Sequence, residues 1–215
     1  MHPWLDFVDL VRASLFMLAH ATHGSTGAAI LALSVLVRMA LLPLSVKVAL
    51  RGYDSAQRQK ALGPEIKRLS ERYKNDPARL WTETRALNKQ HNVQVFTRLS
   101  LFTMMVQMPL GIAVYRVVSE NVLRAGRFLF IPDLAQPNVL LTALIATTGA
   151  LGTLFAPSTA PGKTAAVISS MLITTLIVWR LASGVGLYWL GSSAVGVAQS
   201  LIVKRIVARK RPRMR

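Results

Sequence analysis

The chain has 215 residues, 52% of them hydrophobic, and carries 26 Lys and Arg against 9 Asp and Glu. The absence of cysteine excludes a disulfide framework and a thiolate metal site. A helix needs about 20 apolar residues to cross roughly 30 Å of hydrocarbon, and five stretches reach or approach that length. So many apolar runs leave too little polar surface to cover a soluble core. We therefore expect an all-α polytopic membrane protein with five transmembrane helices, at 27–46, 99–118, 139–156, 164–181 and 183–203.

Residues 1–23 precede the first span and lack the pattern of a cleaved leader. Apolar side chains recur there at helical spacing, with charged residues elsewhere on the wheel. We expect an amphipathic helix that lies flat in the membrane interface. The alternative is a short helix packed against the spans. The apolar positions are Trp4, Phe7, Val8, Val11, Leu15 and Leu18.

The span at 27–46 holds a single charged residue, Arg38, among apolar and small residues. An arginine at the centre of a membrane helix costs roughly 2.5–3.5 kcal/mol even on lenient scales. A side chain this far from either end of the span does not easily reach the interface, although snorkelling remains an alternative. We therefore expect a polar environment around Arg38.

Three spans each present a stripe of polar and small residues at helical spacing. Together these faces would line a hydrophilic groove that holds water around the guanidinium. Small and hydroxyl residues also serve close helix packing, which is the alternative for each taken singly. No span contains Asp or Glu, so Arg38 would remain available to an incoming anionic group. The stripes are Ser34, Arg38 and Ser45; Thr103, Gln107 and Gly111; and Gly184, Tyr188, Ser192 and Gln199.

The segment at 47–98 holds twelve Lys and Arg and contains two amphipathic patterns, at 64–74 and from Pro77 to about Gln90. These patterns predict a helical hairpin over about 53–92 with a basic outer surface. The partners expected for it are anionic, either lipid head groups or ribosomal RNA.

The tail at 204–215 adds seven positive charges and no acid. Excess Lys and Arg in short segments marks the cytoplasmic side, so the tail and the hairpin should both be cytoplasmic. The two segments lie on the same side of the membrane if the number of spans is odd, as it is with five. The N-terminus and the loop at 119–138 are then external. The residues expected to bind a ribosome or a lipid surface are Lys204, Arg205, Arg209, Lys210 and Arg211.

No catalytic, metal or cofactor site is expected. The four histidines show no ligand spacing on a shared face, and no span holds a pair of carboxylates. Motifs for a covalent nucleophile or a phosphate-binding loop are also lacking.

Five motifs, in order and at matching spacing from about 34 to 199, resemble the YidC/Oxa/Alb family of membrane protein insertases. The chain departs from that family at 93–99, where a Pro-Gly-rich turn is usual, and at WRLASG, where a proline is missing. We also expect no large periplasmic domain of the kind that Gram-negative members carry. The motifs are LVRMALLPLSVK, GPEIKRLSERYKNDPARLWTETRALNKQHNV, QMPLGIAVYRVV, FLFIPDL and SGVGLYWLGSSAVGVAQ.

The resemblance implies a five-helix insertase core whose hydrophilic groove is open to the cytoplasm and to lipid and closed on the outer side. Arg38 matches the family's groove arginine, and Ser34 a polar groove position one turn before it. Tyr188 and Trp189 match an aromatic pair along which substrate segments slide. The groove residues expected to bind substrate are Arg38, Ser34, Gln107, Thr103, Tyr188, Trp189 and Ser192.

The expected function is that of an insertase in the bacterial plasma (inner) membrane, with nascent membrane proteins and the lipid bilayer as partners. A ribosome and the Sec translocon are further expected partners, and no small-molecule substrate is expected. Two alternatives remain at this point: a small anion transporter or channel, and a basic scaffold that tethers ribosomes to the membrane. Five spans and no inverted repeat argue against a transporter, and a scaffold does not account for the groove.

Overall fold

The structure is a computed structural model that describes residues 3–93, 98–119, 127–157 and 162–210. Within α5 it describes the backbone throughout, and the side chains except those of 98–100, 102–104, 106, 118 and 119. In this part of the chain there are eight helices and no strand, so the prediction of an all-α fold is confirmed. The helices are α1 (Pro3–Ala21), α2 (Thr26–Ala61), α3 (Gly63–Arg72), α4 (Pro77–Gln90), α5 (Arg98–Ser119), α6 (Val139–Phe155), α7 (Lys163–Val178) and α8 (Ser183–Lys210).

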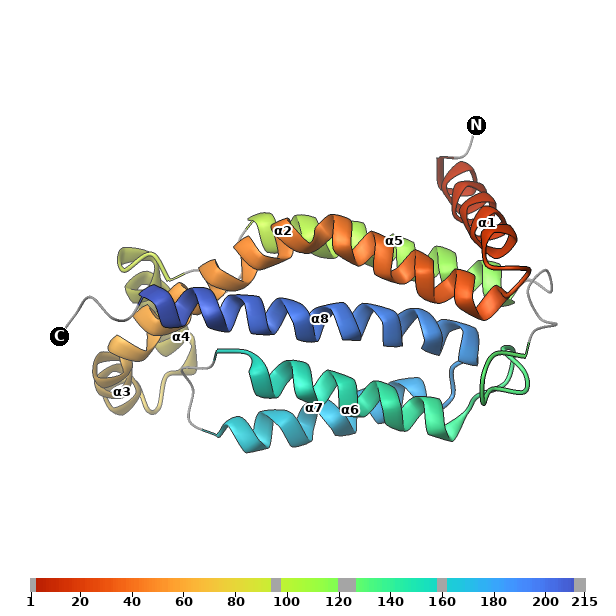
Figure 1. Cartoon of the computed structure of the whole chain (residues 1–215). Helices are drawn as coiled ribbons and strands as arrows, with labels where there is room; N and C mark the ends of the chain where they lie inside the picture. Colours follow the sequence, from red (N-terminus) through yellow and green to blue (C-terminus); the bar gives the residue numbers. More distant parts are fainter. Residues whose placement is uncertain (1–2, 94–97, 120–126, 158–161, 211–215) are drawn as a thin grey trace.

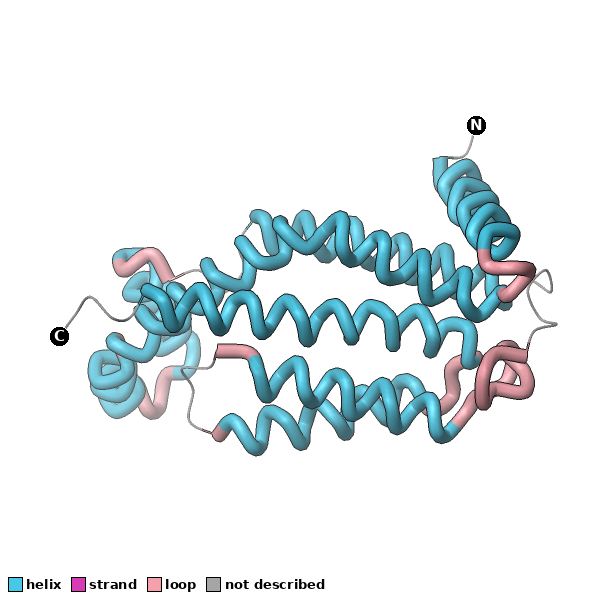
Figure 2. Tube along the Cα trace, viewed as in Figure 1, coloured by secondary structure: helices cyan, strands magenta, loops and turns pink. Residues whose placement is uncertain are grey.

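Five of the helices form an elongated bundle in which successive helices run in opposite directions (Figures 1 and 2). The helix α8 lies between α2 and α6, and α7 packs on α6. The helix α5 packs much less extensively on α2 and α8 than those two pack on each other. This loose contact leaves space between α2, α5 and α8.

Two helices, α2 and α8, are long and apolar enough to cross a membrane, judged by length and composition of the described residues. Two shorter apolar helices, α6 with 17 residues and α7 with 16, begin where the sequence predicted spans at 139–156 and 164–181. The helix α5 coincides to within one residue at each end with the span predicted at 99–118.

Both long helices continue past the ends of their apolar segments. The helix α2 runs fifteen residues beyond 46, through Pro43 and into the basic arm, and α8 runs seven beyond 203, into the basic tail. Hydropathy predicts where a chain meets polar surroundings, whereas a helix ends where its backbone loses hydrogen bonds. Arg58 and Lys60 in the last turn of α2, and Arg209 and Lys210 in that of α8, oppose the negative ends of the helix dipoles.

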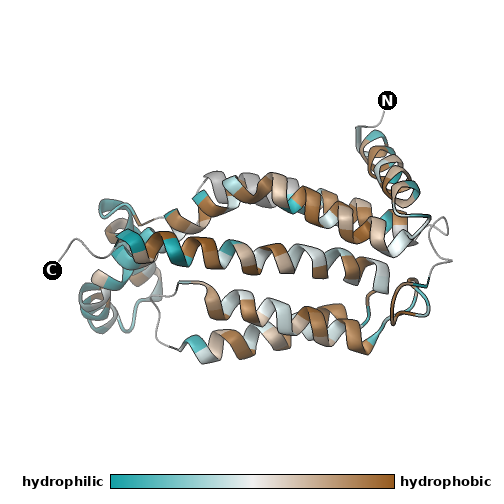
Figure 3. Ribbon diagram, in the orientation of Figure 1, coloured by the Kyte–Doolittle hydropathy of each residue, from teal (hydrophilic) through white to brown (hydrophobic). Residues whose placement is uncertain are grey.

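The helices α3 and α4 pack on each other beyond the end of α2, at the hydrophilic end of the molecule (Figure 3). Asp76 caps α4 by accepting a hydrogen bond from the amide of Arg79, and Pro77 occupies the first helical turn. Arg58 on α2 donates a weak hydrogen bond, 3.4 Å long, to the carbonyl of Asn92 beyond α4.

The helix α1 packs against α2 and α5 through one apolar face made by Val8, Val11 and Leu15. A second apolar set, Leu10, Phe16 and Met17, is exposed on the same helix. The packed face agrees with the alternative of a helix docked on the bundle, and the exposed face leaves room for contact with lipid. Its position in the membrane interface therefore stays a prediction.

The described residues that precede α6, 127–138, lie at the end of the bundle near α1. Ile131 and Leu134 are buried there, and the amide of Gly184 donates to the carbonyl of Leu134 at 2.8 Å. A methyl group on Gly27 would overlap the ring of Phe128, so this glycine allows the segment to lie against α2. The segment is thus fixed to the starts of α2 and α8 by these contacts.

Candidate functional site: a cavity beside Arg38

A cavity of about 640 Å³ lies between α2, α5 and α8. All three helices that the sequence predicted to have a polar face contribute to it. Apolar side chains form much of its wall. The lining residues are Arg38 and Val48 from α2, Gln107, Met108 and Gly111 from α5, and Val185, Tyr188, Trp189, Ser192 and Ser193 from α8.

Arg38 carries the only charge among these lining residues. Its Nη2 lies 3.8 Å from the position that a methyl group on Gly196 would occupy, so the guanidinium rests against the backbone of α8. Its Nε is buried and has no hydrogen-bond partner among the described residues. A guanidinium has five N–H donors and no acceptor. It can therefore bind an anion that enters the cavity.

The apolar core lies between this cavity and the end of the bundle near α1. On α2 the buried positions Ile30 and Leu33 precede Arg38, and on α8 Leu187 comes before Tyr188. On α5, which runs the other way, the buried residues from 110 to 117 follow Gln107. The core thus separates the cavity from the end where α1 lies.

Most of the side chains predicted for the groove do meet at this cavity. Gln107, Tyr188, Trp189 and Ser192 line it together with Arg38. Gly111, the third member of the stripe on α5, has open space where a side chain would stand. Thr103 lies one turn before Gln107 on α5, but its side chain falls outside the described residues.

Ser34 does not line the cavity, although the sequence placed it in the groove. It is 1% exposed, and its hydroxyl donates to the carbonyl of Leu31 in its own helix at 2.9 Å. A methyl group on Gly191 would lie only 2.0 Å from the Ser34 oxygen. This small residue therefore serves the close contact of α2 with α8, which was the alternative for serines in the stripes.

Ser45 and Gln199 also depart from the expected groove. The Gln199 amide donates to the carbonyl of Ser45 at 3.4 Å. This hydrogen bond links α8 to α2 between the cavity and the hydrophilic end of the bundle. Ser45 is buried, and neither its hydroxyl nor the Gln199 oxygen has a partner among the described residues. Gln199 lines a second, separate cavity.

The residues predicted to bind a ribosome or lipid lie on the last turns of α8. Lys204, Arg205, Arg209 and Lys210 are all exposed there, and the Lys204 ammonium lies 5.8 Å from the centre of the Phe155 ring. Arg211 lies outside the described residues. The tail thus begins as an ordered helical surface.

Sequence reasoning missed some of the residues that shape the site. Met108, Ser193 and Val185 line the cavity, and Gly196 supports the guanidinium. Gly191 and Gly196 offered a signal, because glycines on an apolar helix often mark close approach of another group. The apolar lining residues carry no such signal.

Comparison with known proteins shows that the chain is similar to membrane protein insertases. The family model described as 60Kd inner membrane protein matches residues 17–210. A protein named membrane protein insertase YidC from Clostridium tetani is 31% identical over 94% of this chain and 92% of its own length. A protein of the same name from Francisella tularensis subsp. novicida is also 31% identical, over 86% of this chain, but the match spans only 34% of that longer protein.

The fold has a counterpart among solved structures. A crystal structure of an active YidC insertase, with its first transmembrane domain resolved, superimposes with a TM-score of 0.62 over 91% of this chain and 44% of that one. Sequence identity in this comparison is 21%, so the likeness concerns the fold. With the match of the family model over most of the chain, it confirms the resemblance seen in the motifs, and the chain belongs to the YidC/Oxa/Alb family of membrane protein insertases.

Proposed function

We propose that the insertase activity of this chain operates through the cavity beside Arg38. A polar, cytoplasm-open groove partway into the bilayer would shorten the hydrocarbon path that a polar segment of the cargo must cross. The adjoining apolar segment of the cargo would leave into lipid, driven by burial of its own apolar surface. No covalent chemistry is needed.

The observation that carries this proposal is the Arg38 guanidinium at the cavity, whose buried Nε has no hydrogen-bond partner among the described residues. No carboxylate is among the residues that line its cavity, in the part of the chain that the structure describes. An acidic side chain of the cargo would supply the missing partner for a short time. Tyr188 and Trp189 would provide an apolar and hydrogen-bonding surface beside it for the rest of the segment.

The same proposal assigns five membrane spans, formed by α2, α5, α6, α7 and α8. The end with α3, α4 and the basic part of α8 would face the cytoplasm, and the end with α1 would face outside. The charge distribution supports this orientation. The basic α8 surface and the hairpin would then be placed to contact a ribosome, a lipid surface or the Sec translocon.

Purified protein in liposomes, supplied with a single-span cargo that has an acidic N-terminal tail, tests the role of Arg38. We expect Arg38→Ala to reduce insertion about ten-fold or more, because a hydrogen bond to a charged group contributes roughly 1.5–3 kcal/mol. Arg38→Lys should largely preserve insertion, since a point charge in water does not need the planar fork.

Two controls separate this effect from general damage. Arg180→Ala removes an exposed positive charge that stacks on Trp179 away from the cavity, and should insert cargo normally. A cargo with a neutral tail should depend much less on Arg38. Normal insertion of the acidic cargo by Arg38→Ala would refute the attraction step, and anion flux without insertion would favour a conduit.

A further inference from the structure

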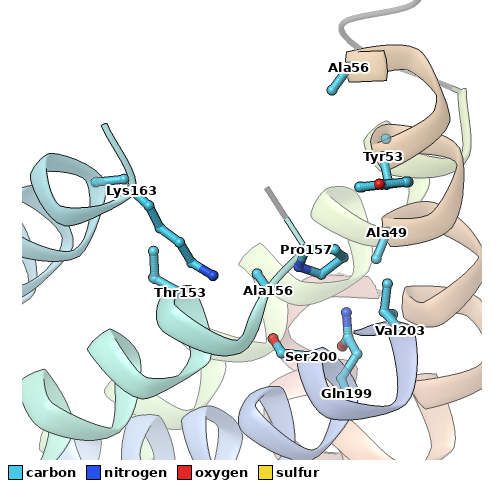
Figure 4. Close-up of a pocket in the computed structure, with 12 residues that line it drawn as sticks. Ala49, Tyr53, Ala56, Thr153, Ala156, Pro157, Lys163, Gln199, Ser200 and Val203 are labelled. Carbon is cyan, nitrogen blue, oxygen red and sulfur yellow. The ribbon is translucent and has the colours of Figure 1, made fainter. Parts of the chain in front are cut away.

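A second cavity, of about 380 Å³, lies at the hydrophilic end of the bundle, between the end of α6, the start of α7, and the long helices α2 and α8 (Figure 4). It shares no lining residue with the cavity beside Arg38. The lining residues are Ala49, Gly52, Tyr53, Ala56, Thr153, Ala156, Pro157, Lys163, Ala166, Gln199, Ser200 and Val203.

The electrostatics of this cavity favour an anion. The side chain of Lys163 extends from α7 toward the end of α6, as Figure 4 shows, and the Lys204 ammonium lies over Phe155 next to the lining residue Ala156. No acidic side chain is among the lining residues in the described part of the chain. The positive field is therefore not cancelled within the cavity.

The start of α7 strengthens that field. Its N-cap is Gly162, in the left-handed region with φ of 91°, and no side chain caps the helix. The first N–H groups of a helix lack intrahelical partners and carry partial positive charge. Lys163 and Ala166, both on this first turn, line the cavity.

The remaining lining combines neutral polar groups with an apolar wall. Ser200 and Tyr53 contribute hydroxyl groups, and the buried side-chain oxygen of Gln199 has no partner among the described residues. Ala49 and Val203 form the apolar part. A ligand suited to these walls has a charged head and an adjoining apolar body.

The level of the cavity along the bundle identifies the source of such a ligand. The apolar segments of α2 and α8 end near 46 and 203, and basic segments begin there. The phosphate groups of a bilayer lie at this boundary between hydrocarbon and water. Anionic phospholipids also attract Lys and Arg at the cytoplasmic surface.

We propose that this cavity binds the head group of an anionic phospholipid, with its phosphate between the Lys163 ammonium and the first turn of α7. The glycerol and first acyl carbons lie against Ala49 and Val203. The bound lipid joins α2, α6, α7 and α8 at the end where few direct contacts connect α7 to α2. This site is independent of the proposed cargo groove.

Native mass spectrometry of the purified full chain tests this assignment with phosphatidylglycerol, phosphatidylcholine and inorganic phosphate as separate probes. Lys163→Gln should weaken phosphatidylglycerol binding about ten-fold, as loss of one charge-assisted contact implies. Lys163→Arg should retain it. The matched control is Lys67→Gln, which removes an exposed lysine on α3 and should bind lipid like the unaltered chain.

A second variant, Ala166→Leu, fills the cavity without changing its charge and should also lose the lipid. Circular dichroism melting identifies variants that fail to fold, and insertion of acidic cargo should persist in all of them. Unchanged phosphatidylglycerol binding by Lys163→Gln or by Ala166→Leu would overturn the site. Displacement of the lipid by millimolar inorganic phosphate would overturn the lipid assignment in favour of a soluble phosphate.

Discussion

Gly191 determines how closely α8 approaches α2 at the level just outside the cavity. A methyl group there would lie 2.0 Å from the Ser34 hydroxyl oxygen and 3.3 Å from its Cβ. We expect Gly191→Ala to lower the free energy of unfolding by about 1–3 kcal/mol, the usual cost of overpacking a closely fitted contact. Denaturant unfolding of both proteins in detergent micelles measures this difference in the free energy of unfolding.

Removal of the opposing oxygen should relieve this clash. In the double variant Ser34→Ala with Gly191→Ala, the nearest atom would be the Cβ at 3.3 Å, so most of the lost stability should return. Gly111→Ala provides the matched control, because nothing lies within 4 Å of its added methyl group. If the stability changes of the two single substitutions simply add in the double variant, Ser34 and Gly191 do not make the close contact described here.

The same pair of residues shows how far the sequence predicts the site. Arg38 could be placed in a polar cavity because only such surroundings make its burial tolerable. Gln107, Tyr188 and Ser192 followed from helical spacing and reach the same cavity. Ser34 did not, since spacing along one helix cannot tell a face that lines a cavity from a face that touches another helix. That distinction depends on Gly191, which lies on a different helix.

At the scale of an element, the stability of α4, the second helix of the hairpin, depends on its N-cap residue Asp76. Asp76 Oδ1 accepts the amide of Arg79 at 3.0 Å, and Asp76 Oδ2 lies 3.8 Å from Nε of the same arginine. Neither α3 nor α4 has a buried residue, so packing adds little to their stability. Local interactions of this kind decide whether a short helix persists.

Asp76→Ala should therefore destabilise α4 by about 1 kcal/mol and speed exchange of its amide hydrogens about five-fold. Asp76→Asn is the matched control, because asparagine caps a helix equally well without the charge. Hydrogen exchange measured by mass spectrometry should localise the change to α4. Equal acceleration in α2 or α8 would mean that the hairpin is part of the cooperative core.

The ends of the helices show which boundaries could be predicted from the sequence and which could not. The bounds of α4 and α5 agree closely with their predictions, because Pro77 marks one start and polar residues flank the other helix. The sequence predicted the ends of the apolar spans at 46 and 203 but not the ends of the helices α2 and α8, because apolar content falls well before helicity does. Continuation of α2 to Ala61 places Tyr53 in the wall of the second cavity, and continuation of α8 to Lys210 places the Lys204 ammonium over the Phe155 ring. The hydropathy pattern alone indicated neither.

At the scale of the whole molecule, charge is divided between the two ends of the bundle. Twenty Lys and Arg belong to the segments at the hairpin end, and five to the segments at the opposite end. The remaining one is Arg38. Such a division orients a membrane protein with its basic end in the cytoplasm. The orientation holds only if α6 and α7 either both cross the membrane or both fail to cross.

The topology therefore depends on whether α6 and α7 cross the membrane, and their lengths bear on that question. At 1.5 Å per residue their 17 and 16 residues extend about 25 Å, a little less than an average hydrocarbon core. Local thinning of the bilayer accommodates such a shortfall at modest cost. A partly apolar hairpin that turned back inside the membrane would instead expose backbone groups of its turn to hydrocarbon. We therefore expect both helices to cross.

The natural absence of cysteine allows a direct measurement, because each introduced cysteine is the only thiol in the chain. In intact cells, an impermeant maleimide should label Gln136→Cys and Arg180→Cys, which replace exposed residues at the end of the bundle that we propose to be external. Ser70→Cys on α3 and Thr164→Cys at the start of α7 should react only after the cells are opened. Labelling of Thr164→Cys from outside, with Ser70→Cys still protected, would mean that α6 and α7 do not cross and that three spans carry the groove.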